Sequence, residues 1–399
     1  MSLLSFEDVR PWARSIKAKT TQREMPPWFI EKNVGIQRFK DDISLTDDEI
    51  ATIARWVDSG AAQGNPADMP PARQFPTGTA WTIGTPDLIV SSPELTVKAV
   101  APDQYGFLTP TPVGLAEDRY VKAVEVREIR VRELEAERTP SGQPRAAMGY
   151  SVLHHAGITT GSGMREDDSP AGRSVGGFAI THEAGQNATV YPDELGIALP
   201  AKSALHWRMH SHSFGKEVVV RLDVAFKFHP QGYTPKYVVR NSAIGGDLSN
   251  HDLDIPAGDN NVRFDAIGII SQPAKLMTFE PHMHAGGKRM CVQVIYPTGV
   301  RETLNCAGYN HNWVKVYSYA DEAAPLLPKG TFVQVIGWYD NSAKNPRVSE
   351  PRNWKGFGSR SIDDMMFFLG RFVPLTEEQF KEEVDAREAR QRNKSTQNQ

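Results

Sequence analysis

The chain has 399 residues, of which 40% are hydrophobic, and its formal net charge at pH 7 is -3. A chain of this length can bury two or three cores, because domains usually hold about 100 to 200 residues. The weak charge, with lysine and arginine scattered singly, argues against nucleic acid as a partner, and no apolar run reaches the roughly 20 residues that a transmembrane segment needs.

The first part of the chain has a helical pattern. Ser5 can cap a helix that runs to about Lys19, and Thr46 with Glu49 forms a capping box at the start of a second helix. The stretch of residues 64–79 is rich in proline, glycine and alanine. We therefore expect a linker there.

From about residue 80 the hydrophobic pattern changes to a period of two, which predicts half-buried β-strands. The clearest example is residues 218–229, where the apolar residues from Val220 to Phe228 share one face. About 290 residues of such strands exceed one ordinary sandwich, and the stretch 241–260, rich in glycine and asparagine, is typical of a joint. The predicted fold class is mainly β, with two tandem antiparallel β-sandwiches of jelly-roll type after a small helical segment.

These patterns divide the chain into four predicted parts. Residues 1–75 form the helical segment, residues 80–240 the first sandwich and residues 241–372 the second. Residues 373–399 are strongly charged and are predicted to form an exposed C-terminal helix or tail.

The histidines are the main functional signal. All eleven follow residue 153, and six of them form the groups His154-His155, His210-x-His212 and His282-x-His284. Alternate residues of a strand point to the same side, so a His-x-His pair can hold one metal ion without backbone distortion. Adjacent His154 and His155 can do so only where the strand is bulged or ends.

The metal itself depends on the remaining donors. Imidazole suits copper, zinc, nickel and iron, whereas a thioether favours copper because soft sulfur stabilises Cu(I). Met365 and Met366 are candidates, at the start of an apolar run that is typical of a buried strand. By spacing alone a methionine there is more typical of the core.

Two other residue types bear on the site. Cys291 and Cys306 flank a predicted turn, so two antiparallel strands can bring them within reach of a disulfide; a reduced, buried pair is the alternative. The acidic pair Asp363-Asp364 is expected in an exposed loop and is not assigned a catalytic role.

The order His-His, single His, His-x-His and Asp-Asp-Met resembles the copper type II, ascorbate-dependent monooxygenases, the family of peptidylglycine alpha-hydroxylating monooxygenase and dopamine beta-monooxygenase. The resemblance covers about residues 80–372. It is nearest to bacterial relatives in which this module is joined to a c-type cytochrome domain. Within residues 5–65, Arg10-Pro-Trp-Ala-Arg14 and Met25-Pro-Pro-Trp28 are similar to the latter part of that cytochrome domain, without its haem-attaching CxxCH motif.

The resemblance implies two copper ions per chain. The first would be held by His154, His155 and His210, with His212 as a possible replacement or addition, and would transfer electrons. The second would be held by His282, His284 and Met365, as the catalytic site where dioxygen is activated and a C–H bond is hydroxylated. The family's two ions face each other across a solvent cleft, which Tyr309, His311 and Trp313 could line.

The resemblance also implies partners and a location. They are a small-molecule substrate, dioxygen and an electron donor, either ascorbate or the haem of an upstream cytochrome domain, with no covalent haem in this chain. A periplasmic or secreted location is expected from the resemblance, although this chain shows no signal peptide, and Met1 is expected to be an internal methionine of a longer precursor.

Two alternatives stay open at this stage. A double β-sandwich can be a module that binds glycans or other ligands without catalysis. A zinc-dependent hydrolase could use His282 and His284 as ligands, with Glu280 as the general base.

Overall fold

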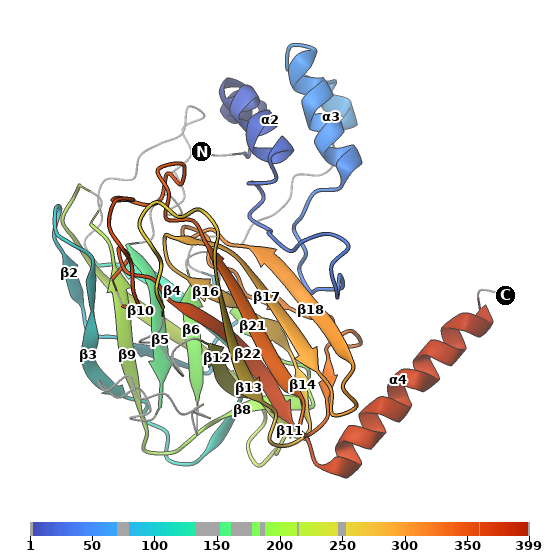
Figure 1. The fold of residues 1–399 in the computed structure, drawn as a ribbon. Helices are drawn as coiled ribbons and strands as arrows, with labels where there is room; N and C mark the ends of the chain where they lie inside the picture. The colour runs from blue at the N-terminus through green and yellow to red at the C-terminus, as the bar shows by residue number, and fades with distance from the viewer. Residues whose placement is uncertain are drawn as a thin grey trace.

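The computed structural model describes residues 3–69, 80–131, 152–160, 178–183, 188–213, 215–245, 253–358 and 360–397. Most of this structure consists of antiparallel β-sheets, with helices near both ends, so the predicted fold class is confirmed (Figure 1). The predicted linker beyond residue 69 and the middle of the predicted joint, residues 246–252, lie outside the described residues.

Two sheets make up the first half of the β-structure. The first has the order β1 (Leu88–Ser91), β10 (Val218–Phe228), β4 (Arg119–Arg130), β8 (Leu195–Leu199) and β11 (Tyr237–Val238), with β2 (Leu95–Val97) on β10 and β7 (Ala188–Val190) on β4. The second has the order β3 (Gln104–Pro112), β9 (Ala204–Ser211), β5 (Leu153–Thr159) and β6 (Ala179–Glu183). Phe226 of the first sheet contacts Phe178 of the second, with ring centroids 5.3 Å apart. The sheets therefore bury a shared core between their apolar faces.

Strand β10 is more buried than its period of two predicted. Its expected inner face is fully covered, but Val219 and Ala225 of the opposite face are also buried. The segment before β1 covers that face, where Thr82 N donates to Glu125 Oε2 at 2.6 Å and Trp81 lies under the Arg127 guanidinium. The covering segment shows no regular alternation of apolar and polar residues, so the sequence did not indicate that it packs on β10.

The second half also contains two main sheets. One has the order β12 (Arg240–Gly245), β22 (Met366–Pro374), β14 (Ala274–Leu276) and β20 (Leu326–Leu327), with β16 (Pro281–Met283) on β22. The other has the order β13 (Val262–Ile269), β21 (Phe332–Tyr339), β17 (Gly287–Ile295) and β18 (Arg301–Gly308), and β15 (Thr278–Phe279) pairs with β19 (Tyr317–Ser318). The sheets approach closely at Gly337, where an added Cβ would lie 2.6 Å from the Met366 sulfur.

The single possible disulfide is present in this second half. Cys291 of β17 and Cys306 of β18 are direct partners in the strand ladder and are bonded. The expectation of two antiparallel strands across a turn is therefore confirmed.

Polar contacts join the two halves. Thr181 Oγ1 of β6 donates to Glu280 Oε1 at 3.0 Å, and an Arg371 guanidinium nitrogen of β22 donates to Thr189 Oγ1 at 3.1 Å. Figure 1 shows β5 and β6 beside β12, β16 and β22. The inner sheet of each half thus faces the other half, and the histidines lie at this contact.

The first predicted N-terminal helix is divided into shorter pieces, whereas the second is present where the capping box predicted it. The N-terminal elements are α1 (Phe6–Val9), the 3-10 turn η1 (Arg10–Trp12), α2 (Ala13–Thr21), α3 (Asp47–Asp58) and the 3-10 turn η2 (Pro66–Asp68). Ser5 caps α1 and the capping box of Thr46 and Glu49 is present. The expected single helix to Lys19 is interrupted at Pro11, whose ring removes a backbone donor and disfavours a continuous helix.

The segment of residues 28–40 attaches these helices to the second half. Glu31 N donates to Cys306 O at 2.9 Å and Ile36 N donates to Leu304 O at 2.8 Å, so the segment pairs along β18. Trp28 packs edge-on against Tyr317, with ring centroids 4.9 Å apart. Helices α2 and α3 therefore stand beside the sheet that contains β17 and β18 (Figure 1).

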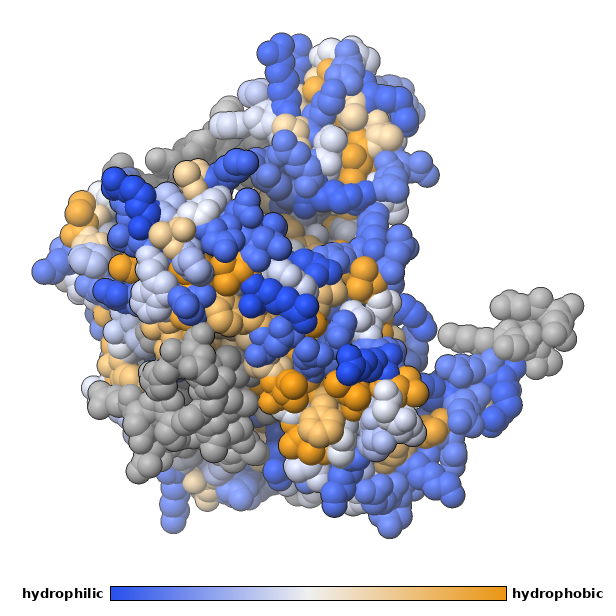
Figure 2. Space-filling model, viewed as in Figure 1, coloured by the Kyte–Doolittle hydropathy of each residue, from blue (hydrophilic) through white to orange (hydrophobic). Residues whose placement is uncertain are grey.

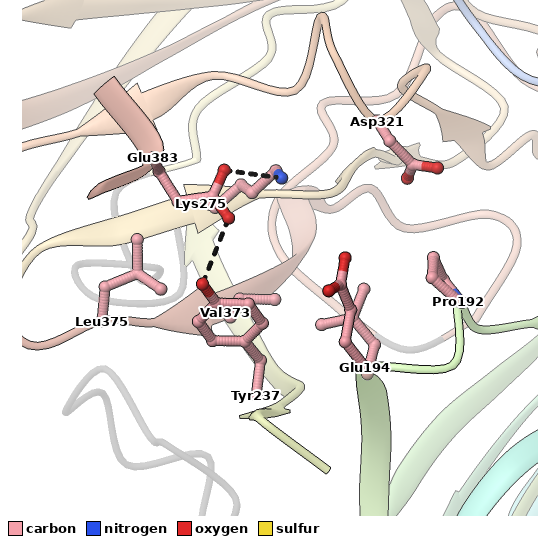
Figure 3. A pocket seen from close by; sticks show the side chains of 9 residues that line it. Pro192, Glu194, Tyr237, Lys275, Asp321, Val373, Leu375 and Glu383 are labelled. Carbon is pink, nitrogen blue, oxygen red and sulfur yellow. Dashed lines mark hydrogen bonds and ion pairs between the residues drawn. The ribbon is translucent and has the colours of Figure 1, made fainter. Parts of the chain in front are cut away.

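The C-terminal helix α4 (Glu377–Gln397) is anchored at its start and projects beyond the β-structure (Figure 1). Figure 3 shows the Glu383 carboxylate accepting from Lys275 at 3.2 Å and from the Tyr237 hydroxyl at 3.3 Å, beside a cavity of about 70 Å³ between the two halves. Its projecting part is hydrophilic (Figure 2). Among the described residues, no helix combines the length and apolar character needed to cross a membrane.

We expect the double substitution Cys291→Ala/Cys306→Ala to lower the free energy of unfolding by up to about 3 kcal/mol, because the disulfide closes a loop of about 15 residues in the unfolded chain. Urea unfolding of the metal-free protein, followed by circular dichroism, measures this change. A reducing agent should shift the wild type by a similar amount and leave the variant unchanged. Equal sensitivity of both proteins to the reducing agent would contradict the prediction.

Candidate metal centre

Seven histidine rings from both halves form one connected cluster. Each ring has a neighbour whose centroid lies within 5.6 Å, and the members are His154, His155, His210, His212, His282, His284 and His311. The rings of His155 and His282 lie 5.2 Å apart and connect the first half to the second. All three predicted histidine groups are therefore brought together.

A β-bulge places the adjacent His154 and His155 in this cluster. The pairing of β5 with β9 shifts register between Leu153 and His155, the irregularity that the sequence demanded if both rings were to serve one ion. Glu128 holds the start of the bulged strand, because its Oε2 accepts from Val152 N and Leu153 N, both at 2.9 Å.

The two ring nitrogens of this pair are set for a shared ion. His154 Nδ1 and His155 Nδ1 lie 3.1 Å apart, and nitrogens that are each about 2.0–2.1 Å from one metal lie roughly 3 Å from each other. His154 Nε2 lies 2.6 Å from the carbonyl oxygen of His311, so this nitrogen donates and leaves the Nδ1 lone pair free in the neutral ring. The gap suits either one shared proton or one metal ion.

His210 completes the first group from β9. Its Nδ1 is buried without a hydrogen-bond partner in the described structure, while its Nε2 lies 3.4 Å from Ser361 Oγ and 3.5 Å from Asp103 Oδ2. Metal-bound imidazoles usually have their second nitrogen held in this way by an oxygen. His212 Nδ1 lies 2.8 Å from Asp103 Oδ1, so Asp103 positions both rings of the His-x-His pair.

The second group sits on and just after β16. His282 and His284 lie on the same side of the chain, with ring centroids 5.6 Å apart. His284 Nδ1 lies 3.3 Å from the Asp363 carbonyl oxygen, and its Nε2 is buried without a hydrogen-bond partner among the described residues. His282 Nδ1 is likewise buried without a hydrogen-bond partner among the described residues.

The expected exposed loop at Asp363-Asp364 is wrong for Asp364. This carboxylate is fully buried and accepts from the backbone nitrogens of His284 at 2.9 Å, Gly286 at 2.9 Å and Met365 at 3.1 Å. Three backbone donors offset the desolvation that a buried carboxylate suffers. Asp364 therefore positions two predicted ligands, whereas Asp363 is partly exposed and pairs with Arg360.

The backbone of Met365 lies close to that of His284. The β16–β22 ladder ends at the pair Met283 and Met366, one residue before His284 and one residue after Met365. The backbone nitrogens of His284 and Met365 both donate to Asp364 Oδ1, at 2.9 and 3.1 Å. Met365 is buried, and its carbonyl accepts from the Tyr339 hydroxyl at 2.7 Å. The predicted sulfur-bearing ligand is thus next to the second group along the backbone.

Burial keeps these imidazoles neutral at physiological pH. Desolvation, reinforced by the neighbouring imidazoles, lowers the pKa of His154 to about 3 and the pKa values of His210 and His284 to about 4. The pKa of His282 is lowered well below its usual value by the same burial. Neutral imidazole is the form that binds metal.

The residues expected to line a cleft separate into different environments. His311 is buried against His154, with ring centroids 4.5 Å apart. The buried Tyr309 hydroxyl donates to the Met283 carbonyl oxygen, which is a core contact, and Trp313 is half-buried in a turn. The two metal groups pack against each other instead of facing each other across a cleft.

Several site residues escaped the sequence reasoning. Asp103 and Glu128 hold predicted ligands in place but belong to no motif, and Asp364 belongs to the Asp-Asp-Met motif but was not expected to position its neighbours. Glu183 of β6 lies opposite His155 in the strand ladder, and Arg208 precedes His210 by two positions on the same side of β9. Because alternate residues of a strand share a face, the position of Arg208 two residues before His210 could have identified it. No pattern in the sequence relates Asp103, Glu128 or Glu183 to the histidines.

The donor set fits metal ions. The nitrogens of His154, His155 and His210 lie within 4.8 Å of one another, as do those of His154, His212 and His311. Asp103 with His210 and His212 forms a further such group. Soft or borderline ions that prefer nitrogen, such as copper and zinc, match these donors better than Ca²⁺ or Mg²⁺, which require mostly oxygen.

Comparisons with known proteins add no family. No protein-family model matches the chain, and no curated protein matches it. Similar solved structures include the T13 IBDV viral particle (10% identity, 76% of this chain and 73% of that chain, TM-score 0.20) and PNGF-II (11% identity, 72% of this chain and 60% of that chain, TM-score 0.22). A Bacillus subtilis oxalate decarboxylase variant shares 8% identity over 75% of this chain and 80% of its own, with a TM-score of 0.14. Similarity at this level carries no functional argument.

We expect Glu128→Ala to weaken metal binding at the first group by about 10- to 100-fold, because the variant releases the backbone that forms the bulge. Glu125→Ala is a matched control, since Glu125 lies on the same strand and accepts from Thr82 N and Ile83 N away from the histidines. Competition with a chelator for copper(II) measures both affinities. Equal weakening in the two variants would show that Glu128 acts only through stability.

We expect Asp364→Asn to lower the free energy of unfolding by about 1–3 kcal/mol. The NH₂ group of asparagine cannot accept a hydrogen bond, so at least one backbone N–H that donates to the Asp364 carboxylate loses its acceptor. Asp363→Asn removes an exposed ion pair and should cost at most about 1 kcal/mol. Urea unfolding of both metal-free variants gives the comparison. A larger loss in the Asp363 variant would be inconsistent with the role assigned to Asp364.

Proposed function

We propose that this protein is a copper-dependent monooxygenase that hydroxylates a C–H bond of an organic substrate with dioxygen. The first copper would be held by His154, His155 and His210, and the second by His282, His284 and Met365.

One observation carries the proposal. Buried ring nitrogens without hydrogen-bond partners in the described structure occur in both groups, at His210, His282 and His284. An unpaired buried polar atom costs about 1–3 kcal/mol, so such atoms gathered in one place call for a ligand. The Nδ1 atoms of His154 and His155, 3.1 Å apart, supply a matching pair of donors.

Copper is favoured over zinc by the donor types. A methionine, Met365, shares the Asp364 carboxylate with His284 through its backbone nitrogen, and thioether sulfur stabilises Cu(I). The general base of the alternative zinc hydrolase would be Glu280, but its Oε1 already accepts from Thr181. Burial raises the pKa of Glu280 to about 7, which does not by itself favour hydrolysis.

Bound copper would supply the redox chemistry by which one atom of dioxygen enters the C–H bond and the other forms water. The chain's own residues orient the ligands: the His311 carbonyl holds His154, Asp103 and Ser361 hold His210, and the Asp363 carbonyl holds His284. Protein packing around these rings excludes water and keeps the imidazoles neutral.

The remaining parts of the proposal rest on the resemblance to the copper type II, ascorbate-dependent monooxygenases. Hydroxylation with dioxygen consumes two electrons and two protons per turnover, so an external reductant is required. Ascorbate or the haem of an upstream cytochrome domain would serve, and the protein would work in the periplasm or outside the cell.

The experiment compares Met365→Leu with Met366→Leu in copper-loaded protein supplied with ascorbate. Met366 is the matched control because it points into the core beside Gly337. We expect about two copper ions per wild-type chain and ascorbate-dependent oxygen uptake that Met365→Leu reduces by at least about 100-fold. The first copper should remain, as seen by paramagnetic resonance, and Met366→Leu should behave like the wild type.

Other outcomes separate the alternatives. Oxygen uptake that is unchanged in Met365→Leu contradicts the monooxygenase assignment. A protein that takes up no copper on loading supports a binding module instead, and a protein that retains zinc in preference to copper supports the hydrolase.

A further inference from the structure

His311 is a buried imidazole that makes no hydrogen bond through its ring. Neither ring nitrogen has a partner in the described structure, although a neutral imidazole offers one donor and one acceptor. The ring lies between the two groups, 4.5 Å from the ring of His154 and 5.6 Å from that of His284. Both nitrogens are therefore without a hydrogen bond in the described structure, in a ring that lies next to other imidazoles.

His212 also has a ring nitrogen that is available to bind a metal ion. Its Nδ1 lies 2.8 Å from Asp103 Oδ1, and a carboxylate at this distance accepts a hydrogen bond from Nδ1–H, so that Nε2 of the neutral ring carries the lone pair. The ring centroid of His212 lies 4.9 Å from that of His154. One nitrogen from each of His154, His212 and His311 can be chosen so that all three lie within 4.8 Å of one another.

His154 belongs to both sets of three nitrogens. Its Nδ1 lies 3.1 Å from His155 Nδ1, and its Nε2 lies 2.6 Å from the His311 carbonyl oxygen. An ion held by His154 can have either His155 and His210, or His212 and His311, as its other protein ligands. The two positions share the His154 ring and lie side by side.

We propose that His154, His212 and His311 form a second position for the ion of the first group, on the side of His154 that borders the second group. The ligand is a transition-metal ion that prefers imidazole. Its identity as copper rests on the proposed function, whereas the existence of the position does not. His311 is on this view a metal ligand instead of a residue that lines a substrate cleft.

The experiment removes one ligand from each set in metal-free protein that is then loaded with Cu(II) or, separately, with Zn(II). His155→Ala disables the first set, and His155→Ala/His311→Ala disables both. The control is His155→Ala/His206→Ala, because His206 lies on β9 but outside the cluster. Metal content per chain, chelator competition and the Cu(II) paramagnetic resonance spectrum are measured.

We expect His155→Ala to keep its ion of the first group, with an altered resonance spectrum and an affinity reduced by roughly 10- to 100-fold. The control should match it. His155→Ala/His311→Ala should lose the ion from both positions, because neither set that contains His154 then keeps three imidazoles. Where alanine at position 311 prevents folding, His155→Ala/His311→Gln gives the same comparison with the side-chain volume largely kept.

The inference is overturned if His155→Ala alone loses the ion of the first group, or if the His155/His311 double variant retains it. Neither readout requires turnover. A protein that shows the alternative position but no ascorbate-dependent oxygen uptake disproves the monooxygenase and leaves this inference standing. A protein that shows ascorbate-dependent oxygen uptake but no alternative position for the ion disproves this inference alone.

Discussion

Imidazole rings from two β-sandwiches are buried against each other, and this contact is the constraint on which the site depends. Each ring loses hydration, so its charged form is disfavoured and its polar nitrogens need partners inside the protein. Carbonyl oxygens of His311 and Asp363 and the carboxylate of Asp103 engage the outward nitrogens. The other nitrogens of His210, His282 and His284 have no hydrogen-bond partner in the described structure, so the cluster could hold metal ions.

The same contact is polar beyond the histidines. Thr181 bonds Glu280 and Arg371 bonds Thr189 across the two halves, and Glu183 is buried near Glu280. Burial and the nearby Glu280 carboxyl raise the pKa of Glu183 well above its usual value. An apolar interface has no directional bonds to prevent one half from sliding along the other, whereas these hydrogen bonds fix β6 next to the start of β16 and β7 next to β22. Ligands from different sandwiches are thereby kept in register.

Local signals predicted the elements well. The caps at Ser5 and Thr46 and the alternating pattern of residues 218–228 depend on neighbouring residues; both caps are present and the alternating segment is strand β10, although both of its faces are buried. The bulge at His154 was deduced as a requirement of shared ligation and is present. The covering of β10 by residues 80–87 was missed, because a segment without periodicity reveals neither its position nor its partner.

The gathering of the histidines was predicted, but their arrangement was not. Which histidines gather could be read from their grouping, yet the ring contact between His155 and His282 depends on how two separate folds dock. Asp364 was placed in an exposed loop because two adjacent acids usually are solvated. Its three backbone donors come from residues brought near only by folding. The spacing of residues along the sequence does not indicate such partners.

The pairing of residues 28–40 along β18 has a consequence for how the protein behaves at high concentration. Unprotected edges of β-sheets recruit strands from other molecules, and natural proteins cover or charge these edges to prevent it. Here the chain's own N-terminal region supplies that cover through backbone bonds such as Glu31 N to Cys306 O. Proteolysis that frees this region would turn β18 into a nucleus for self-association, whatever ion the histidines hold.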